Sequence, residues 1–364
     1  MFQNIRDFFK SRSKKFLGID IGTSSIKIVE MRRQGKGRGL ENYGEIKNSS
    51  FKKKHFRAFQ KNTLLLSNRE IAKAIQAVCK EAGIQTKEVS FSIPDFCSFF
   101  TGFKLPAMGK DEIPQAVRYE VRPYIPLPLS DVTLDWSIIE GEVSKTPLKV
   151  LVAAVPNDII NQYQEIAHLA DLKLRVLESE VFALVRALAK KNEKEKEITG
   201  LIDIGARSTT CSILEQGILK TSYSFNIAGN ELTGIIAKSL NIDYNKAEEM
   251  KRKQGLLFKN EIGEFQKNIR EVLLPLIDSI LEEIRKVFRD FYRNEGKEVK
   301  KIILAGGLVS MPGFKEYFST ELKKELDIAD PFFNIACPAI LTNTLKEIGP
   351  SYAIGVGLAL KGLE

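Results

Sequence analysis

The stretch Ile19-Asp20-Ile21-Gly22 near the start of the chain occurs a second time, about half the chain later, as Ile202-Asp203-Ile204-Gly205. Hydroxyl side chains follow each glycine, Thr23-Ser24-Ser25 in the first copy and Ser208-Thr209-Thr210 in the second, before an apolar run resumes. This pattern predicts a strand, a tight glycine turn and a returning strand. One copy would fit an ordinary strand end, but two copies at this separation indicate an internal repeat.

Such a turn suits phosphate binding, because a glycine without Cβ lets backbone N–H groups approach an anion. An aspartate at the mouth of each turn would repel a bare phosphate. Its presence is best explained by a divalent cation between the carboxylate and the phosphate. The two hairpins together therefore predict a clamp for a metal-bound phosphate.

Length and composition favour a globular protein with two domains: 364 residues, 43% hydrophobic and 28% charged. No apolar run approaches the roughly 20 residues that span a bilayer, and no apolar signal core is present, so we expect a cytoplasmic protein. The four cysteines lie far apart without a Cys-x-x-Cys pair, which argues against a zinc site or a disulfide framework.

The net charge of +9 is concentrated in the first 70 residues. This local excess suggests an anionic partner for one face of the protein and not a nucleic-acid-binding fold throughout. Residues 1–15 combine apolar side chains at helical spacing with several lysines and arginines, which predicts a basic amphipathic segment. It could lie on an anionic membrane surface, dock against a partner helix or pack on its own domain.

The remaining pattern predicts strands over 16–48, a helix that begins at Ser67 with a Ser67–Glu70 capping box, and a compact unit inserted from Val89 to Ala170. The charged run KKNEKEKE at 190–197 reads as a hinge. The second half then repeats the order of the first, with added helices at 230–240, 243–253 and 264–293 and a last helix over 352–360.

With the two hairpins, the Ala305-Gly306-Gly307 turn and a glycine-rich last helix, the chain resembles the actin, Hsp70 and sugar-kinase superfamily. Its inserted unit is similar to the extra subdomain of FtsA-type proteins. Five separated stretches resemble the PilM family of type IV pilus assembly: IPLPLSDVTLDW, ESEVFALVRAL, IAGNELTGIIAKSL, NKAEEMKRKQG and GGLVSMPGF. The resemblance implies an α/β, actin-like (ribonuclease H-like) two-domain ATPase fold with an FtsA-type inserted subdomain.

It also implies a division into subdomains. The first domain would comprise 16–88 and 171–198, completed by the C-terminal helix 345–364, with 89–170 as the inserted subdomain. The second domain would comprise 199–228 and 299–344, with 229–298 as a helical subdomain over the nucleotide.

The same resemblance implies roles for individual residues in binding ATP and Mg²⁺. Asp20 and Asp203 would hold Mg²⁺ largely through water. The first phosphate hairpin would be Gly22, Thr23, Ser24 and Ser25, with Lys27 near it, and the second Asp203, Gly205 and Ser208. The other contacts would be Gly229 beside the β-phosphate, Glu248 and Lys251 at ribose and adenine, and Gly306, Gly307 and Met311 at the adenine-side turn.

Hydrolysis needs a group that positions water in line with the γ-phosphate. The connecting helix offers Glu178 or Glu180. Alignment with the family motif favours Glu180 as the catalytic residue. Alternatively, both carboxylates only stabilise the start of that helix, where its dipole favours acids. Slow hydrolysis or none would fit either reading.

By resemblance, the chain is an ATP-binding interaction protein. Its expected partner is the cytoplasmic N-terminal tail of PilN, held in a groove between the first domain and the inserted subdomain. Other inner-membrane platform proteins of the pilus are further possible partners, so the chain would be peripheral to the inner membrane. Two alternatives are an FtsA-like division filament and a small-molecule kinase, although no acidic motif for an acceptor base is found in the inserted unit.

Overall fold

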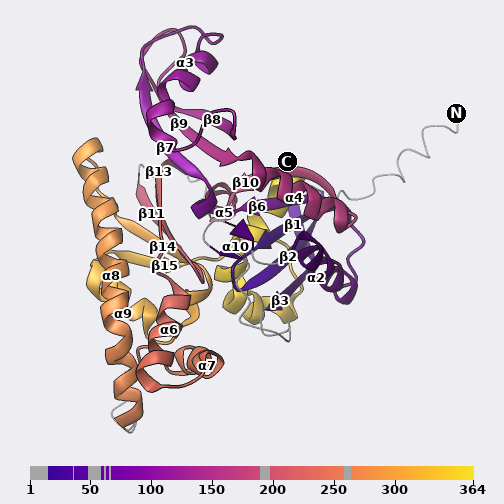
Figure 1. The fold of residues 1–364 in the computed structure, drawn as a ribbon, viewed down its shortest axis with the longest axis vertical. Coiled ribbons are helices and arrows are strands. Elements are labelled where there is room, and N and C mark those ends of the chain that lie inside the picture. Colours follow the sequence, from indigo (N-terminus) through magenta and orange to yellow (C-terminus); the bar gives the residue numbers. More distant parts are fainter. Residues whose placement is uncertain are drawn as a thin grey trace, which may run out of the picture. The chain divides into compact units, whose positions relative to one another are not determined.

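The computed structural model describes residues 15–35, 37–47, 59–60, 63–64, 67–188, 197–257 and 264–364. They form two compact units (Figure 1). Unit 1 contains the described parts of 1–94, 158–188 and 330–364, and unit 2 those of 95–157 and 189–329. The predicted N-terminal amphipathic segment lies outside the described residues, except Lys15, and so does almost all of the predicted hinge at 190–197.

Unit 1 is built on a five-stranded sheet in the order β10-β6-β1-β2-β3. β1 and β2 form the first hairpin and β3 extends it antiparallel, while β6 and β10 are parallel to β1. The strands are β1 (Lys15–Ile21), β2 (Ser25–Gln34), β3 (Gly37–Lys47), β6 (Glu88–Ile93) and β10 (Lys173–Ser179). A separate two-stranded ladder joins β4 (Phe59–Gln60) and β5 (Thr63–Leu64).

Helices cover both faces of this sheet. Gly18 of β1 faces α10, whereas its neighbour Ile19 is in register with Phe91 of β6, whose ring packs edge-on against Tyr163 of α4. α4 and α10 therefore lie on opposite faces. The helices of unit 1 are α2 (Asn68–Glu81), α4 (Asn157–Leu169), α5 (Glu180–Leu188) and α10 (Thr342–Leu363), with a short 3₁₀ turn η5 (Ala339–Leu341). The predicted Ser67–Glu70 capping box of α2 is confirmed.

Unit 2 contains a second five-stranded sheet whose order, β15-β14-β11-β12-β13, matches that of unit 1 strand for strand. β11 and β12 form the second hairpin, β13 extends it antiparallel, and β14 and β15 run parallel to β11. The strands are β11 (Ile198–Ile204), β12 (Thr209–Glu215), β13 (Ile218–Phe225), β14 (Lys301–Ala305) and β15 (Glu325–Ile328). The repeat predicted from the two Asp-Ile-Gly stretches is thus a repeat of sheet topology.

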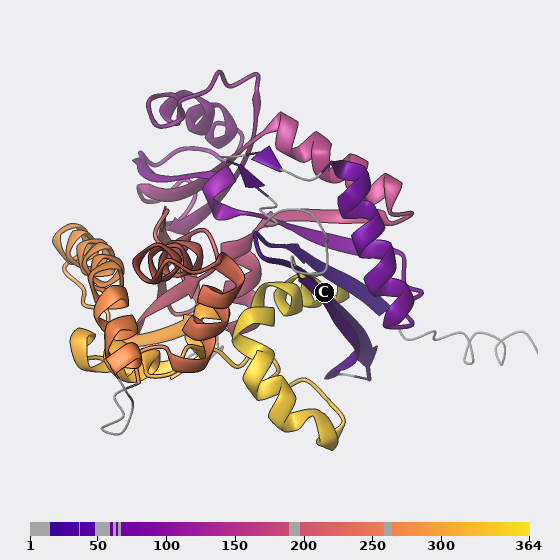
Figure 2. The ribbon, with the colours of Figure 1, turned by 60° about the horizontal axis from the view of Figure 1, so that its bottom comes forward.

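Four helices and a short 3₁₀ turn complete this part of unit 2 (Figure 2). Their apolar faces and the sheet form one core that includes Ile202, Leu232 and Ile277. The elements are α6 (Gly229–Leu240), α7 (Tyr244–Gln254), α8 (Glu264–Glu295), η4 (Gly307–Ser310) and α9 (Phe314–Leu322).

The inserted segment forms a three-stranded sheet in the order β7-β9-β8. A separate apolar core joins this sheet to α3 through Ile113, Val117 and Val150, among others. Its elements are η2 (Asp95–Cys97), β7 (Phe99–Leu105), α3 (Ile113–Glu120), η3 (Arg122–Tyr124), β8 (Val132–Glu140) and β9 (Leu148–Pro156).

Three segments group differently from the predicted boundaries. Residues 89–93 belong to β6, a strand of the main sheet of unit 1, and α4 packs on that sheet, so neither belongs to the inserted subdomain. Residues 330–344, predicted in the second domain, group with unit 1, where the Ala336 N–H donates to the Arg38 carbonyl at 2.9 Å. The last helix begins at Thr342, three residues before the start at 345 that the resemblance implies and ten before the start at 352 that the sequence pattern predicts. Within the described ranges, no helix is long and apolar enough to cross a membrane.

Candidate functional site

The first hairpin turn, in unit 1, is closed by its own backbone. The Gly22 N–H donates to the Ser25 carbonyl at 3.0 Å. A Cβ at Gly22 would lie 3.1 Å from that oxygen, which is tighter than ordinary contact. The glycine therefore leaves room for a close turn, while its N–H is used to close the turn itself. Thr23 and Ser25 are buried, and Ser24 is exposed at the tip.

Asp20 lies on β1 just before this turn and is almost fully buried. Its Oδ1 accepts a hydrogen bond of 2.9 Å from the Ser92 hydroxyl of β6, and Lys27 is its register partner on β2. Burial raises the pKa of the Asp20 carboxyl, and Lys27 and Ser92 offset this only in part. A divalent cation beside Asp20 would favour the ionised form.

The two carboxylates proposed to position water differ in their surroundings. Both Glu178 oxygens are engaged by Arg186 of α5, with Nη2 to Oε2 at 2.9 Å and Nη1 to Oε1 as the second contact. Arg186 Nη1 also donates to the Gly357 carbonyl of α10 at 3.2 Å. Glu178 thus fastens α5 in place. Glu180, the first residue of α5, is half-buried.

The second hairpin turn, in unit 2, has the same closure as the first. The Gly205 N–H donates to the Ser208 carbonyl at 3.0 Å, and a Cβ at Gly205 would lie 3.2 Å from that oxygen. Asp203 is the register partner of Thr210 on β12 and of Ala305 on β14. The two turns are therefore alike in backbone geometry as well as in sequence.

The start of α6 rests on this second hairpin. The Gly229 N–H donates to the Gly205 carbonyl at 3.1 Å, and the Asn230 N–H donates to the Ala206 carbonyl at 2.7 Å. A Cβ at Gly229 would lie 3.2 Å from the Gly205 oxygen. Gly229 thus allows the helix to approach the hairpin closely, and its N–H is used in that contact.

Glu248 and Lys251, predicted at the ribose and adenine, form an ion pair within α7, with Nζ to Oε2 at 2.6 Å. Arg252 Nε also donates to Glu248 Oε1 at 2.7 Å. Burial alone would raise the pKa of Glu248, but Lys251, Thr233 and Arg252 together outweigh it and hold that pKa below its ordinary value. The two residues are three positions apart, about one turn of the helix. The pair lies next to Thr233 of α6, whose hydroxyl oxygen is 2.5 Å from Glu248 Oε2.

The predicted adenine-side turn follows β14. Gly306 has φ of +93°, and a Cβ there would lie 2.3 Å from the Ile204 carbonyl and 2.6 Å from Asp203 Oδ1. Gly307 has nothing within 4 Å of its Cβ position. The Met311 side chain is buried and packs against Gly255 at the end of α7. A Cβ added to Gly255 would lie 2.9 Å from Met311 Cγ. Unit 2 thus brings Asp203, Gly205, Ser208, Gly229 and Gly306 together around one hairpin.

Sequence reasoning missed three residues that take part in these contacts: Ser92, Thr233 and Arg207. Arg207 lies inside the second hairpin, and its guanidinium stacks at 4.3 Å on the ring of Phe96 in the inserted segment. Because Arg207 lies between Gly205 and Ser208 in the sequence, its position in the predicted hairpin could have identified it as a candidate site residue. Ser92 and Thr233 carry no local signal, because only sheet pairing and helix packing bring them to Asp20 and Glu248.

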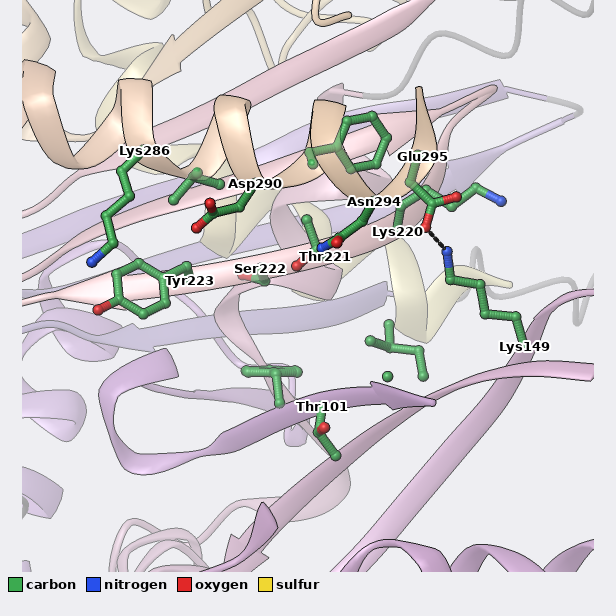
Figure 3. A pocket seen from close by; sticks show the side chains of 15 residues that line it. Thr101, Lys149, Lys220, Thr221, Ser222, Tyr223, Lys286, Asp290, Asn294 and Glu295 are labelled. Atoms are coloured by element: carbon green, nitrogen blue, oxygen red, sulfur yellow. Dashed lines mark hydrogen bonds and ion pairs between the residues drawn. The ribbon is translucent and has the colours of Figure 1, made fainter. Parts of the chain in front are cut away.

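A separate cavity of about 320 Å³ opens within unit 2 (Figure 3). It is lined by the edge strands β7 and β13, by β9 and by one face of α8, and an ion pair between Lys149 and Glu295 lies at one end. None of the predicted nucleotide residues lines it. Across the described ranges, no group of three or more His, Cys, Asp and Glu side chains could hold a metal ion.

Two sheets of the same order, each with an Asp-Ile-Gly hairpin, define an actin-like protein. The match to solved structures agrees: MreB5 of Spiroplasma citri has this fold, with a TM-score of 0.56, 13% identity and 94% of each chain covered. The model of the type IV pilus assembly protein PilM family matches residues 18–363. The chain belongs to the PilM family and is an actin-like protein of type IV pilus assembly.

Two further proteins show sequence similarity to this chain as well as a shared fold or family. A structure described as a PilM-PilN type IV pilus biogenesis complex shares 25% identity and a TM-score of 0.84, covering 96% of this chain and 98% of that one. The cell division protein FtsA of Bacillus subtilis (strain 168) is 26% identical over 187 residues, which are 47% of this chain and 40% of that protein. The expected likeness to both PilM and FtsA is confirmed.

Proposed function

We propose that the chain binds Mg-ATP with its two hairpins and, under control of that nucleotide, the cytoplasmic N-terminal tail of PilN. The observation that carries this proposal is the duplicated hairpin: two turns closed by the same glycine-to-serine bond, each with an aspartate two residues before the glycine. The triphosphate of ATP has enough phosphate oxygens to face both hairpins.

Asp20 and Asp203 are the proposed Mg²⁺ residues, acting largely through water. Bound Mg²⁺ would neutralise phosphate charge next to carboxylates that would otherwise repel it. The N–H groups of the hairpin glycines close the turns. These glycines would help phosphate binding because, without a Cβ, they leave room for the phosphates to approach the backbone. Gly306 and Gly307 would do the same at the adenine, and nucleotide binding would favour a closed state of the two units.

The PilM-PilN complex at 25% identity supports PilN as the partner. The inserted subdomain also exposes apolar side chains suited to a protein contact: Tyr119 (68% exposed), Tyr124 (54%) and Leu127 (37%). The Arg122 guanidinium lies 5.8 Å from the centre of the Tyr119 ring. Tyrosine and arginine are enriched where protein interfaces gain most of their affinity.

The test is the affinity of a synthetic PilN tail for the full chain, measured by calorimetry with and without Mg-ATP. We expect binding in at least one state and a change of affinity of about fivefold or more between the states, the usual size of such coupling. A scrambled peptide of the same composition is the control. Binding of ATP without binding of the tail in either state would leave the nucleotide site standing and remove PilN as the partner.

The role of Glu180 has its own test, with Glu178 as the matched control. We expect Glu180→Gln to lower the rate of ATP hydrolysis by about 10²-fold, the usual contribution of a positioned base, with little change in ATP affinity. Glu178→Gln should instead lower the free energy of unfolding by about 1–3 kcal/mol, because it releases Arg186. Unchanged hydrolysis in Glu180→Gln would contradict the assignment.

A further inference from the structure

Lys251 is the one buried lysine among the described residues, with 5% of its surface exposed. Lysine is rarely buried unless its charge is paired and its donors are satisfied. The surroundings of Lys251 therefore indicate what its ammonium does, and they differ from what the family resemblance implies for it.

All three donors of the Lys251 ammonium have partners within the protein. Nζ lies 2.8 Å from the Gly229 carbonyl, 2.7 Å from the Thr233 hydroxyl oxygen and 2.6 Å from Glu248 Oε2. An ammonium has three N–H bonds and no acceptor. Contact with a ribose or an adenine would therefore require the side chain to give up one of these partners.

Electrostatics favour the arrangement as it stands. Burial lowers the pKa of Lys251, and the Glu248 carboxylate raises it again only in part. A charge in such a place depends on its fixed partners, because water cannot replace them. Exchange of Glu248 or the Gly229 carbonyl for a ligand atom is thus disfavoured.

Of the three partners of the Lys251 ammonium, the Gly229 carbonyl is the one that connects it to the proposed phosphate-binding hairpin. Lys251 holds the carbonyl of this first residue of α6, while the N–H of the same residue is bonded to the Gly205 carbonyl of the second hairpin. A continuous chain of hydrogen bonds therefore runs from α7 through the start of α6 to the hairpin turn. Thr233 adds a second bond to the Gly229 carbonyl, at 2.9 Å.

We infer that Lys251 is a positioning residue: it fixes the start of α6 on the second hairpin, and so sets the phosphate-binding backbone, without contacting the nucleotide. This inference rests on the proposed nucleotide function. It predicts that loss of Lys251 weakens the phosphate end of the site and leaves discrimination of base and sugar unchanged.

The test compares the Mg complexes of ATP, 2′-deoxy-ATP and GTP on the full chain. We expect Lys251→Met to weaken all three by the same factor, about tenfold. Lys253→Met is the matched control, because Lys253 lies on the same helix in an exposed pair with Glu249 at 2.6 Å. It should leave all three affinities unchanged.

A loss for ATP that is absent for 2′-deoxy-ATP or GTP would overturn the inference and make Lys251 a direct contact of ribose or base. An unchanged affinity for all three would overturn it as well. If Lys251→Met does not fold, Thr233→Val takes its place, since it keeps the ammonium and removes one of its partners. Its expected result is a smaller loss, equal for the three nucleotides. If the native chain binds none of them, the proposed function fails instead.

Discussion

Gly18→Ala is expected to destabilise unit 1 by about 3 kcal/mol or more, because it forces a methyl group between two backbones. A Cβ at Gly18 would lie 2.0 Å from the Gly355 carbonyl and 2.5 Å from the Ala359 nitrogen of α10. Both are main-chain atoms of a long helix, so neither can move aside alone. Thermal unfolding, followed together with limited proteolysis of unit 1, measures the effect.

Gly234→Ala is the matched control for this change. Gly234 lies inside α6, and nothing is found within 4 Å of its Cβ position. There the added methyl should stabilise the helix by up to about 1 kcal/mol, since alanine favours a helix over glycine. Gly18→Ala with native stability would mean that α10 does not pack on β1 as closely as these distances require.

Gly306→Ala and Gly307→Ala should separate fold from ligand binding at two adjacent positions. Gly306 has φ of +93°, and its Cβ would lie 2.3 Å from the Ile204 carbonyl. Its replacement should lower the stability of unit 2 by about 1–3 kcal/mol, from strain and overlap, and also disturb Asp203. We therefore expect loss of both thermal stability and ATP affinity.

Gly307 has open space around its Cβ position, so Gly307→Ala should leave stability within about 0.5 kcal/mol of native. Its ATP affinity should nevertheless fall, if adenine packs on this turn as proposed. The two measurements are the melting temperature without ligand and the dissociation constant of Mg-ATP. Native affinity in Gly307→Ala would remove this residue from the site, and native stability in Gly306→Ala would contradict the geometry of the turn.

The family, the repeat and the hairpins could be predicted from sequence because each rests on a local pattern. Glycine followed by hydroxyl residues between two apolar runs specifies a turn whatever surrounds it, and both turns are closed by the predicted glycine. The capping box of α2 is equally local. The boundaries of the inserted segment could not be predicted as well. A strand such as β6 would have the same sequence pattern in the main sheet of unit 1 and in the sheet of the inserted segment. Only its pairing with β1 assigns it to unit 1.

The sequence by itself determined the two Asp-Ile-Gly hairpins, their repetition and the residue types available for phosphate and metal. Only the tertiary structure decided which of those residues remain available to a ligand. It joins Glu178 to Arg186 and surrounds Lys251 with Gly229, Thr233 and Glu248. The physical reason is that a turn is fixed by neighbouring residues, whereas the burial and partners of a charge depend on helices that meet only in the folded chain.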